Sequence, residues 1–278
     1  MMPATPTALG YRMPAEWEPH EATLIAWPHH RDDWPGKFPP IPWVYVEIVR
    51  HLSRVERVDI LLTHLHMDHI QGLGFFGPLY RPDLDVHIWG PASARASLHD
   101  RLTRYLSPPL FPVRLRDLAS HVTLDETPVR QPFGIGGIEV VADTIIHPGL
   151  TVGYRLSEFS TVMAYLPDHE PTLGTRQLPD GPEWTSGLGL AVGADLIIHD
   201  AQYTEDEYRE RSGWGHSTVD HALRFAERAG APRLVAFHHD PSHDDEILDA
   251  MMDAARGVSD VELIPGQEGI VIELAESF

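Results

Sequence analysis

The chain of 278 residues contains no cysteine and a single lysine, Lys37. The absence of cysteine excludes a disulfide framework, a thiolate zinc site and a cysteine nucleophile. Acidic side chains outnumber basic ones by 41 to 21, which gives a formal net charge of −20 at pH 7. So acidic a chain repels a nucleic-acid backbone, and it has no basic arm to offset that repulsion. We therefore do not expect a long nucleic acid as a partner.

Long apolar runs are also absent. No stretch approaches the roughly 18 residues that are needed to span a bilayer. The N-terminus lacks the basic-then-apolar pattern of a signal segment. These absences predict a cytoplasmic protein without membrane contact. The length is compatible with one large α/β domain or two small ones, and a homo-oligomer stays open.

The most informative stretch is Thr63-His64-Leu65-His66-Met67-Asp68-His69, which follows the apolar run 58–62. Side chains alternate between the faces of a strand, so His64 and His66 should leave the strand end on the same side. Imidazoles and carboxylates are ligands for first-row metal ions of borderline softness. Consecutive residues such as Asp68 and His69 diverge, so the spacing predicts two adjacent sites. One would use His64 and His66, and the other Asp68 and His69.

This motif resembles the His-x-His-x-Asp-His signature of the metallo-β-lactamase superfamily. The resemblance extends over about 58–275 and is strongest to the phosphodiesterase and ribonuclease Z-like branch. It implies an α/β fold, the αβ/βα sandwich of that family, with two divalent metal ions. Zinc is the expected metal, although manganese and iron also accept histidine and carboxylate ligands.

The same resemblance implies the remaining ligands. A β-rich run over 138–146 ends at His147, which would complete the site of His64 and His66. An aspartate after a hairpin bridges both metals in the family, and Asp168 is our candidate, with His169 and Glu170 as alternatives. His238, at the end of the strand 233–237, would join Asp68 and His69. The adjacent His239 and the later His243 are then secondary groups, because neighbouring side chains rarely serve one ion.

Two residues are candidates for proton transfer. Asp68 could accept a proton as well as bind metal. His216 lies in Gly215-His216-Ser217-Thr218, which is similar to segments of ribonuclease Z and related phosphodiesterases whose histidine helps the leaving group. We interpret His216 as an acid or phosphate-binding group at a helix start, against the alternative of a helix-start residue alone.

Residues 1–57 resemble a different family, the agmatine deiminases and bacterial-type peptidylarginine deiminases. The resemblance rests on Gly10 to Glu21, Ala26-Trp27-Pro28, Asp33-Trp34-Pro35-Gly36 and Ile41-Pro42-Trp43. Deiminase activity is excluded, because that family attacks with a cysteine thiolate. We therefore interpret the chain as a fusion. A deiminase-like βαβ segment, 1–57, would replace the usual first strands of a metal hydrolase domain, 58–278.

Local patterns predict the other elements. Helices are expected over 92–106, 217–229 and 244–256, with Ser217 and Asp220 as the capping pair of the second helix. The expected strands are 58–62, 86–89, 138–146, 152–156, 161–165, 195–199, 233–237, 261–264 and 269–273.

These observations predict a binuclear metal-dependent hydrolase. A hydroxide that bridges the two ions beside Asp168 would attack a small anionic phosphodiester. Hydrolysis of a C–O or C–N bond, as in lactonases and β-lactamases, could use the same metal pair. A third alternative is an inactive fusion whose missing strands leave a sheet edge open to self-association.

Overall fold

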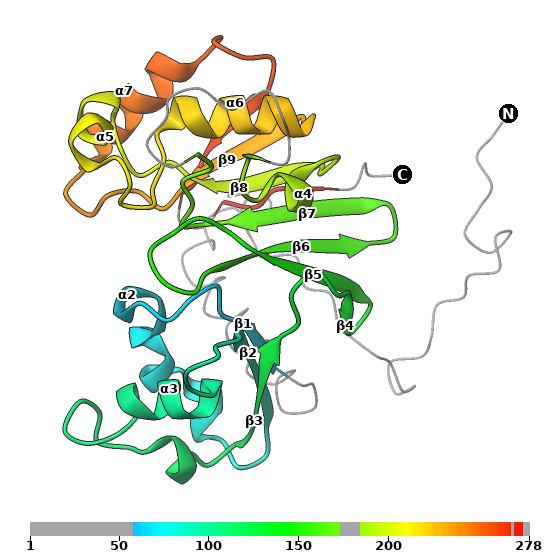
Figure 1. The fold of residues 1–278 in the computed structure, drawn as a ribbon, viewed down its shortest axis with the longest axis vertical. Helices are drawn as coiled ribbons and strands as arrows, with labels where there is room; N and C mark the ends of the chain where they lie inside the picture. Colours follow the sequence, from blue (N-terminus) through cyan, green and yellow to red (C-terminus); the bar gives the residue numbers. More distant parts are fainter. Residues whose placement is uncertain (1–57, 173–183, 268–269, 275–278) are drawn as a thin grey trace, which may run out of the picture.

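The computed structural model describes residues 58–172, 184–267 and 270–274 (Figure 1). The segment 1–57, with its predicted strand and helix, lies outside the described residues. Within those ranges, no helix combines the length and apolar character that a membrane span requires.

The larger of two sheets has seven strands in the order β10-β9-β8-β7-β6-β5-β4. Strands β4 to β7 pair antiparallel, and strands β7 to β10 pair parallel. In the parallel part, β8 and β9 are short apolar runs and most of their residues are buried, whereas β10 lies at the sheet edge and is more exposed. The bounds are β4 (Phe133–Ile135), β5 (Ile138–Thr144), β6 (Val152–Glu158), β7 (Thr161–Leu166), β8 (Leu196–Asp200), β9 (Arg233–Phe237) and β10 (Glu262–Pro265).

The smaller sheet has three parallel strands in the order β1-β2-β3. They are β1 (Val58–Leu61), β2 (Asp85–Pro91) and β3 (His121–Thr127). Short helical elements connect them: α2 (Met67–Ile70), η3 (Gln71–Phe75), η4 (Gly77–Tyr80), α3 (Leu98–Tyr105) and η5 (Leu115–Asp117). Leu98 and Leu102 of α3 pack with Val86 and Ile88 of β2 in one buried cluster.

Four helices belong to the larger sheet. They are α4 (Leu188–Ala191), α5 (Glu205–Arg211), α6 (Val219–Ala229) and α7 (Asp245–Ala255). Figure 1 shows α6 and α7 outside this sheet, on the side away from β1–β3. Leu223 and Phe225 of α6 are buried with Ile197 of β8 and Leu234 of β9, so this helix covers the parallel strands.

A third apolar cluster joins the two sheets. Val140, Val152 and Tyr154 of the larger sheet are buried in it, and Leu61 of β1 packs against them. The Tyr154 hydroxyl donates to the carbonyl of Leu62 over 2.7 Å. The described layers therefore run helix, sheet, sheet, helix, which confirms the predicted αβ/βα sandwich.

Two predicted helix starts were wrong. The helix predicted from 92 begins at Leu98, because Ser97 caps it by accepting from the backbone N–H of Asp100. Thr218, and not Ser217, caps α6, and it accepts from the N–H of His221. The Ser217 hydroxyl instead donates to the carbonyl of His169 over 2.6 Å.

The strand predicted over 269–273 was also wrong, since residues 270–274 form no strand. Ile270 and Ile272 line a hollow together with Phe237 and Tyr165, so their alternation reflects side-chain packing without ladder pairing. In the same segment, the carbonyl of Glu273 accepts from the Arg233 guanidinium over 2.7 Å.

Candidate metal centre

The chain leaves β1 and enters the histidine motif at the seam between the sheets. The Leu62 N–H donates to the carbonyl of Trp89, and the carbonyl of Thr63 accepts from the N–H of Val152 in the larger sheet. These bonds fix the start of the motif on both sides. His64 and His66 then point the same way, with 3.1 Å between His64 Nε2 and His66 Nδ1.

The other three predicted ligands come from the larger sheet. His147 follows β5, Asp168 follows β7 and His238 directly follows β9. These three strands run in the same direction, so their carboxyl ends lie at one edge of the sheet. That edge faces the histidine motif.

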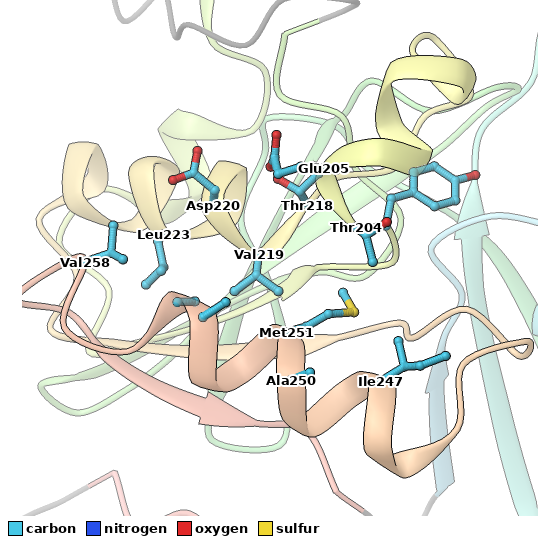
Figure 2. Close-up of a pocket in the computed structure, with 13 residues that line it drawn as sticks. Thr204, Glu205, Thr218, Val219, Asp220, Leu223, Ile247, Ala250, Met251 and Val258 are labelled. Atoms are coloured by element: carbon cyan, nitrogen blue, oxygen red, sulfur yellow. The ribbon is translucent and has the colours of Figure 1, made fainter.

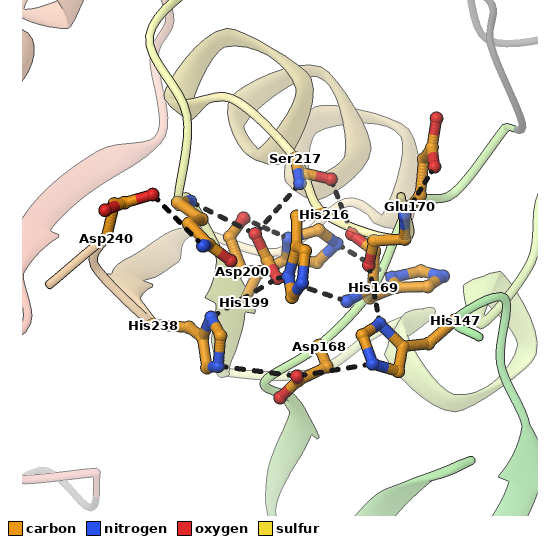
Figure 3. Close-up of polar contacts among 12 residues, drawn as sticks. His147, Asp168, His169, Glu170, His199, Asp200, His216, Ser217, His238 and Asp240 are labelled. Carbon is orange, nitrogen blue, oxygen red and sulfur yellow. Dashed lines mark hydrogen bonds and ion pairs between the residues drawn. The ribbon is translucent and has the colours of Figure 1, made fainter. Parts of the chain in front are cut away.

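Asp168 lies at the centre of the assembled group, and Figure 3 shows it between His147 and His238. Its carboxylate is buried, with 1% of the residue exposed. The oxygen Oδ2 has four imidazole Nε2 atoms around it, at 3.3 Å (His69), 3.4 Å (His238), 3.6 Å (His147) and 3.7 Å (His64).

The remaining ligand candidates complete a set on each side of this carboxylate. On one side, His147 Nε2 lies 3.2 Å from His66 Nδ1. On the other side, Asp68 Oδ2 lies 3.3 Å from His69 Nε2, which lies 3.4 Å from His238 Nε2. Two triplets of ligand atoms are close enough to share an ion, because within each triplet all the atoms lie within 4.8 Å of one another. The first triplet comes from His64, His66 and His147, and the second from Asp68, His69 and His238. The structure thus brings together all seven residues that the sequence singled out.

Neighbouring groups orient the rings. The Nδ1 of His147 is 3.0 Å from the carbonyl of Gly215, which can only accept, so Nδ1 carries the proton. Its Nε2, which faces Asp168, is then free of a proton in the neutral ring. A hydrogen bond from the far ring nitrogen to a backbone carbonyl is the usual way to orient a metal-binding histidine.

Burial and charge favour the protonation states that a metal ion requires. Burial lowers the pKa of His64 to about 3 and lowers that of His147, so both rings are neutral near pH 7. Burial alone would raise the pKa of Asp168, but the hydrogen bond from His69 and the neighbouring imidazoles hold it well below its usual range. The hydrogen bond to Asp168 in turn raises the pKa of His69. The neutral imidazoles of His64 and His147 beside the ionised Asp168 are ready metal donors, whereas an ion at His69 would have to displace its proton.

An unpaired buried atom supports the fit of a divalent ion to this group. The Oδ1 atom of Asp168 is buried and has no hydrogen-bond partner. Ring nitrogens also gather at this carboxylate, and His69 Nε2 lies 3.4 Å from His238 Nε2. A cation that replaced the proton between them could accept both nitrogens as ligands. These histidine and aspartate side chains could hold divalent metal ions.

The backbone of His238 is strained. Its φ is +58°, in the left-handed region that residues other than glycine seldom adopt. Such strain persists where the surrounding structure over-determines it, and it gathers at functional sites. Here it turns the imidazole toward Asp168 directly after β9.

His216 lies at the edge of the same group and pairs with a residue that sequence reasoning missed. Its Nδ1 is 2.7 Å from Oδ2 of Asp200, which is fully buried at the end of β8. Burial opposes the charged form of His216, but the hydrogen bond and charge of Asp200 outweigh it and raise its pKa. The backbone N–H groups of Gln202 and Ser217 donate to the other oxygen of Asp200.

The two alternatives to Asp168 have other partners. The Nδ1 of His169 lies 2.9 Å from Nε2 of the buried His199. The carboxylate of Glu170 accepts from the Tyr208 hydroxyl at 2.8 Å and from the N–H groups of Gly213 and Gly215 at 3.0 and 2.9 Å. This geometry favours Asp168 as the central carboxylate.

Of the two secondary histidines, one borders the centre and one does not. His239 lines the cleft over the metal centre, and its Nε2 lies 3.3 Å from the carbonyl of Gly266. His243 pairs with Glu207 at 3.0 Å, away from Asp168.

The group opens into a polar cleft of about 380 Å³. It is lined by His66, Asp68, His147, Pro148, Asp168, Gln202, Trp214, His216, His238, His239 and Pro241. A more apolar hollow of about 440 Å³ lies between α6 and α7 (Figure 2). Its wall includes Leu223, Met251 and Val258 but no histidine, so it lacks the metal-ligand types that line the polar cleft.

The fold and this histidine–aspartate group define a hydrolase of the metallo-β-lactamase fold. The family model for the beta-lactamase superfamily domain matches residues 44–239, and the chain belongs to that family. Ribonuclease Z from Haloarcula marismortui is 26% identical over 257 residues, a match that covers 76% of this chain and 78% of the relative.

Solved structures agree on the fold. Human tRNase Z, short form, has a TM-score of 0.56 at 21% identity, with 84% of this chain and 85% of that chain covered. A diphosphatase from the PhnP family has a TM-score of 0.53 at 19% identity, with 84% and 78% covered.

The N-terminal segment has a different relative. Agmatine deiminase from Pseudomonas aeruginosa is 40% identical over 57 residues, which are 20% of this chain and 16% of that protein. The short match is compatible with the deiminase resemblance. The family model already begins at residue 44, however, so the boundary between 1–57 and 58–278 stays a prediction.

Proposed function

We propose that this protein is a binuclear metal-dependent phosphodiesterase that hydrolyses small phosphodiesters. The observation that carries the proposal is the position of Asp168, whose buried carboxylate has histidines from both sheets around one oxygen. His64, His66 and His147 would hold one ion, Asp68, His69 and His238 the other, and Asp168 would bridge them. Two such ions, zinc being our first choice, would supply an activated water and clamp the anionic oxygens of the substrate.

The side chains around the ions would carry the proton transfers. His216 would donate a proton to the leaving oxygen, because Asp200 holds its ring by Nδ1 and favours its charged form. Its other nitrogen, Nε2, then carries the proton that can be given away. Asp68, whose side chain is 68% exposed, is accessible from the cleft and could take up a proton from the water that attacks.

Two observations support a phosphodiester as the substrate. The relatives include ribonucleases Z and a diphosphatase of the same fold, whose names refer to phosphorus–oxygen bonds. The charge of the chain, −20, disfavours polyanions, while a small anion can be held by the ions alone. RNA is the second candidate, favoured by the ribonuclease Z relatives. A cytoplasmic location and a homo-oligomeric state stay predictions.

Metal stoichiometry tests the proposal first. Elemental analysis of monodisperse protein should give about two ions per chain, and His66→Ala should lose a large part of them. His99→Ala is the matched control, because His99 is an exposed histidine of α3 whose nearest carboxylate is Asp100 at 3.7 Å. A chain that binds no metal after reconstitution would instead fit the inactive fusion.

Turnover of bis(4-nitrophenyl) phosphate by the metal-loaded protein is the second test. We expect hydrolysis that disappears with chelation and returns when metal is restored. Intact metal binding without phosphodiester turnover would overturn the phosphodiesterase proposal and favour C–O or C–N bond hydrolysis at the same centre.

A further inference from the structure

Trp214 is an exposed aromatic side chain at the metal centre. It leaves 61% of its surface exposed, although it lines the same cleft as His147, His216 and Asp168. Pro148 and Pro241 also line this cleft. The wall therefore has an apolar, aromatic part beside the metal-binding part.

The backbone on both sides of Trp214 is anchored, which fixes the point on the cleft wall from which this side chain extends. Glu170 is buried, with 1% of the residue exposed, and its carboxylate accepts from the N–H groups of Gly213 and Gly215. The backbone N–H of Trp214 donates to the backbone carbonyl of Arg211 over 3.0 Å. A carboxylate buried in this way needs such donors, and here it obtains them from the residues that flank the tryptophan.

Gly215 links this anchor to the metal centre. Its φ is +91°, and a Cβ there would lie 2.3 Å from Pro148 and 2.6 Å from Nδ1 of His147. Only glycine fits this close approach. The carbonyl of Gly215 accepts from His147, so the same loop orients a metal ligand and carries the tryptophan.

An exposed indole on the wall of a cleft offers its face for stacking with planar rings. Base–aromatic stacking contributes about 1–3 kcal/mol per base and tolerates any base, because every base has a π-face. The cleft volume of about 380 Å³ falls in the range of small-ligand sites. An anionic phosphate at the ions would leave the adjoining ring of the same molecule beside Trp214.

We propose that Trp214 is a stacking platform for a nucleobase or similar planar ring, so that the substrates are phosphodiesters of nucleotide type. This inference rests on the proposed function and narrows it. It predicts that the protein binds a phosphate compound with a planar ring more tightly than one without such a ring. A site that held its substrate through the metal ions alone would bind both equally.

Adenosine 5′-monophosphate and ribose 5-phosphate test the proposal, since they differ by the base alone. Their affinities for the metal-loaded protein are measured by titration calorimetry and by competition with bis(4-nitrophenyl) phosphate. We expect the nucleotide to bind roughly tenfold more tightly or better, as one stacked base implies. Trp214→Ala should abolish that preference while ribose 5-phosphate binds as before, and Trp214→Phe should retain part of it.

Trp184→Ala is the matched control, because Trp184 is 72% exposed and does not line the cleft. It should leave both affinities unchanged. Equal binding of the two phosphates by the wild-type protein, or a preference that survives Trp214→Ala, would overturn the proposal. Calorimetry reports either result even if bis(4-nitrophenyl) phosphate is not hydrolysed, so failure of the proposed function is seen separately.

Discussion

Two groups of histidines lie on opposite sides of the segment that carries Asp168. The cleft histidines are His64, His66, His69, His147 and His238, and they converge on one another. All of them except His66 have their Nε2 atom within 4 Å of a single carboxylate oxygen, Oδ2 of Asp168. The core histidines, His169 and His199, are fully buried and pack against Phe225 with ring distances of 5.5 and 4.9 Å. The sequence offers the same residue type in both groups.

The two groups differ in the partners of their ring nitrogens. In the core, His199 Nδ1 donates to the carbonyl of Asp200 over 2.8 Å, and His199 Nε2 can then accept from His169. The nitrogens that face each other in this pair are therefore satisfied without an ion, although the buried Nε2 of His169 has no hydrogen-bond partner. In the cleft, the ring nitrogens face one another around the buried Asp168, whose Oδ1 has no partner. Burial alone therefore does not identify a metal ligand, whereas convergent acceptors around one carboxylate do.

The largest effect is expected from Asp168→Asn, which removes the charge at the centre of the cleft histidines. Metal-assisted charge stabilisation amounts to several kcal/mol, so activity on bis(4-nitrophenyl) phosphate should fall roughly 10³-fold or more. Metal content, measured by elemental analysis, should drop as well. Asp206→Asn, at an exposed carboxylate of α5, is the control. If Asp168→Asn kept full metal content and activity, the cleft histidines would not differ from the core histidines by converging on a metal-binding carboxylate.

Asp200→Asn should have the next largest effect, through His216. An amide can no longer stabilise the charged ring, so proton donation weakens by roughly 10²-fold or more. Diesters with alkoxide leaving groups, which need that proton, should lose far more activity than those with 4-nitrophenolate. Metal content should be retained. A loss that is the same for both leaving groups would argue against an acid role.

Within the core pair, His199→Leu should affect stability and leave metal binding unchanged. It deprives the His169 Nδ1–H of its acceptor, and an unpaired buried donor costs about 1–3 kcal/mol. Urea unfolding measures the loss. The double variant His169→Leu/His199→Leu should lose less than the two single variants together, because no polar ring is left without its partner. A drop in metal content without a drop in stability would place His199 with the cleft histidines.

The smallest effect concerns acid sensitivity. Burial lowers the folded-state pKa of His199 to about 4, below the unfolded value of 6.5. Its contribution to stability is therefore complete above pH 6.5 and is lost as the pH falls from 6.5 toward 4. Between pH 7 and pH 5.5 the loss is about 1 kcal/mol. The stability gap between wild type and His199→Leu should narrow by that amount, and a gap independent of pH would contradict the buried neutral ring.

The cleft histidines could be predicted because their signals are local. The motif spacing places His64 and His66 on one side, and His147 and His238 stand at the ends of apolar runs, so their convergence follows from strand direction. Asp200 and Glu170 could not be predicted in the same way. Their partners, His216 and Gly215, are 16 and 45 residues further along the chain, so neither pairing can be inferred from the spacing of nearby residues.

The fold shows the same contrast. Strands with continuous apolar runs were predicted, whereas β3 was missed, because its residues alternate between exposed and half-buried and read as a polar loop. The short helix α5 was also missed, although Thr204 and Glu207 form a capping box that is visible in the sequence. In that case the signal was present and not used.

The position of the cleft histidines at the seam between the sheets has a consequence for assembly of the chain. His66 and His147 are 81 residues apart, and His69 and His238 are 169 apart. Contacts of such long sequence separation form late, once loop-closure entropy has been overcome. An ion that needs ligands from both sheets can bind with its full ligand set only after the two sheets have packed together. Once bound, it would cross-link the two sheets and stabilise their packing against separation.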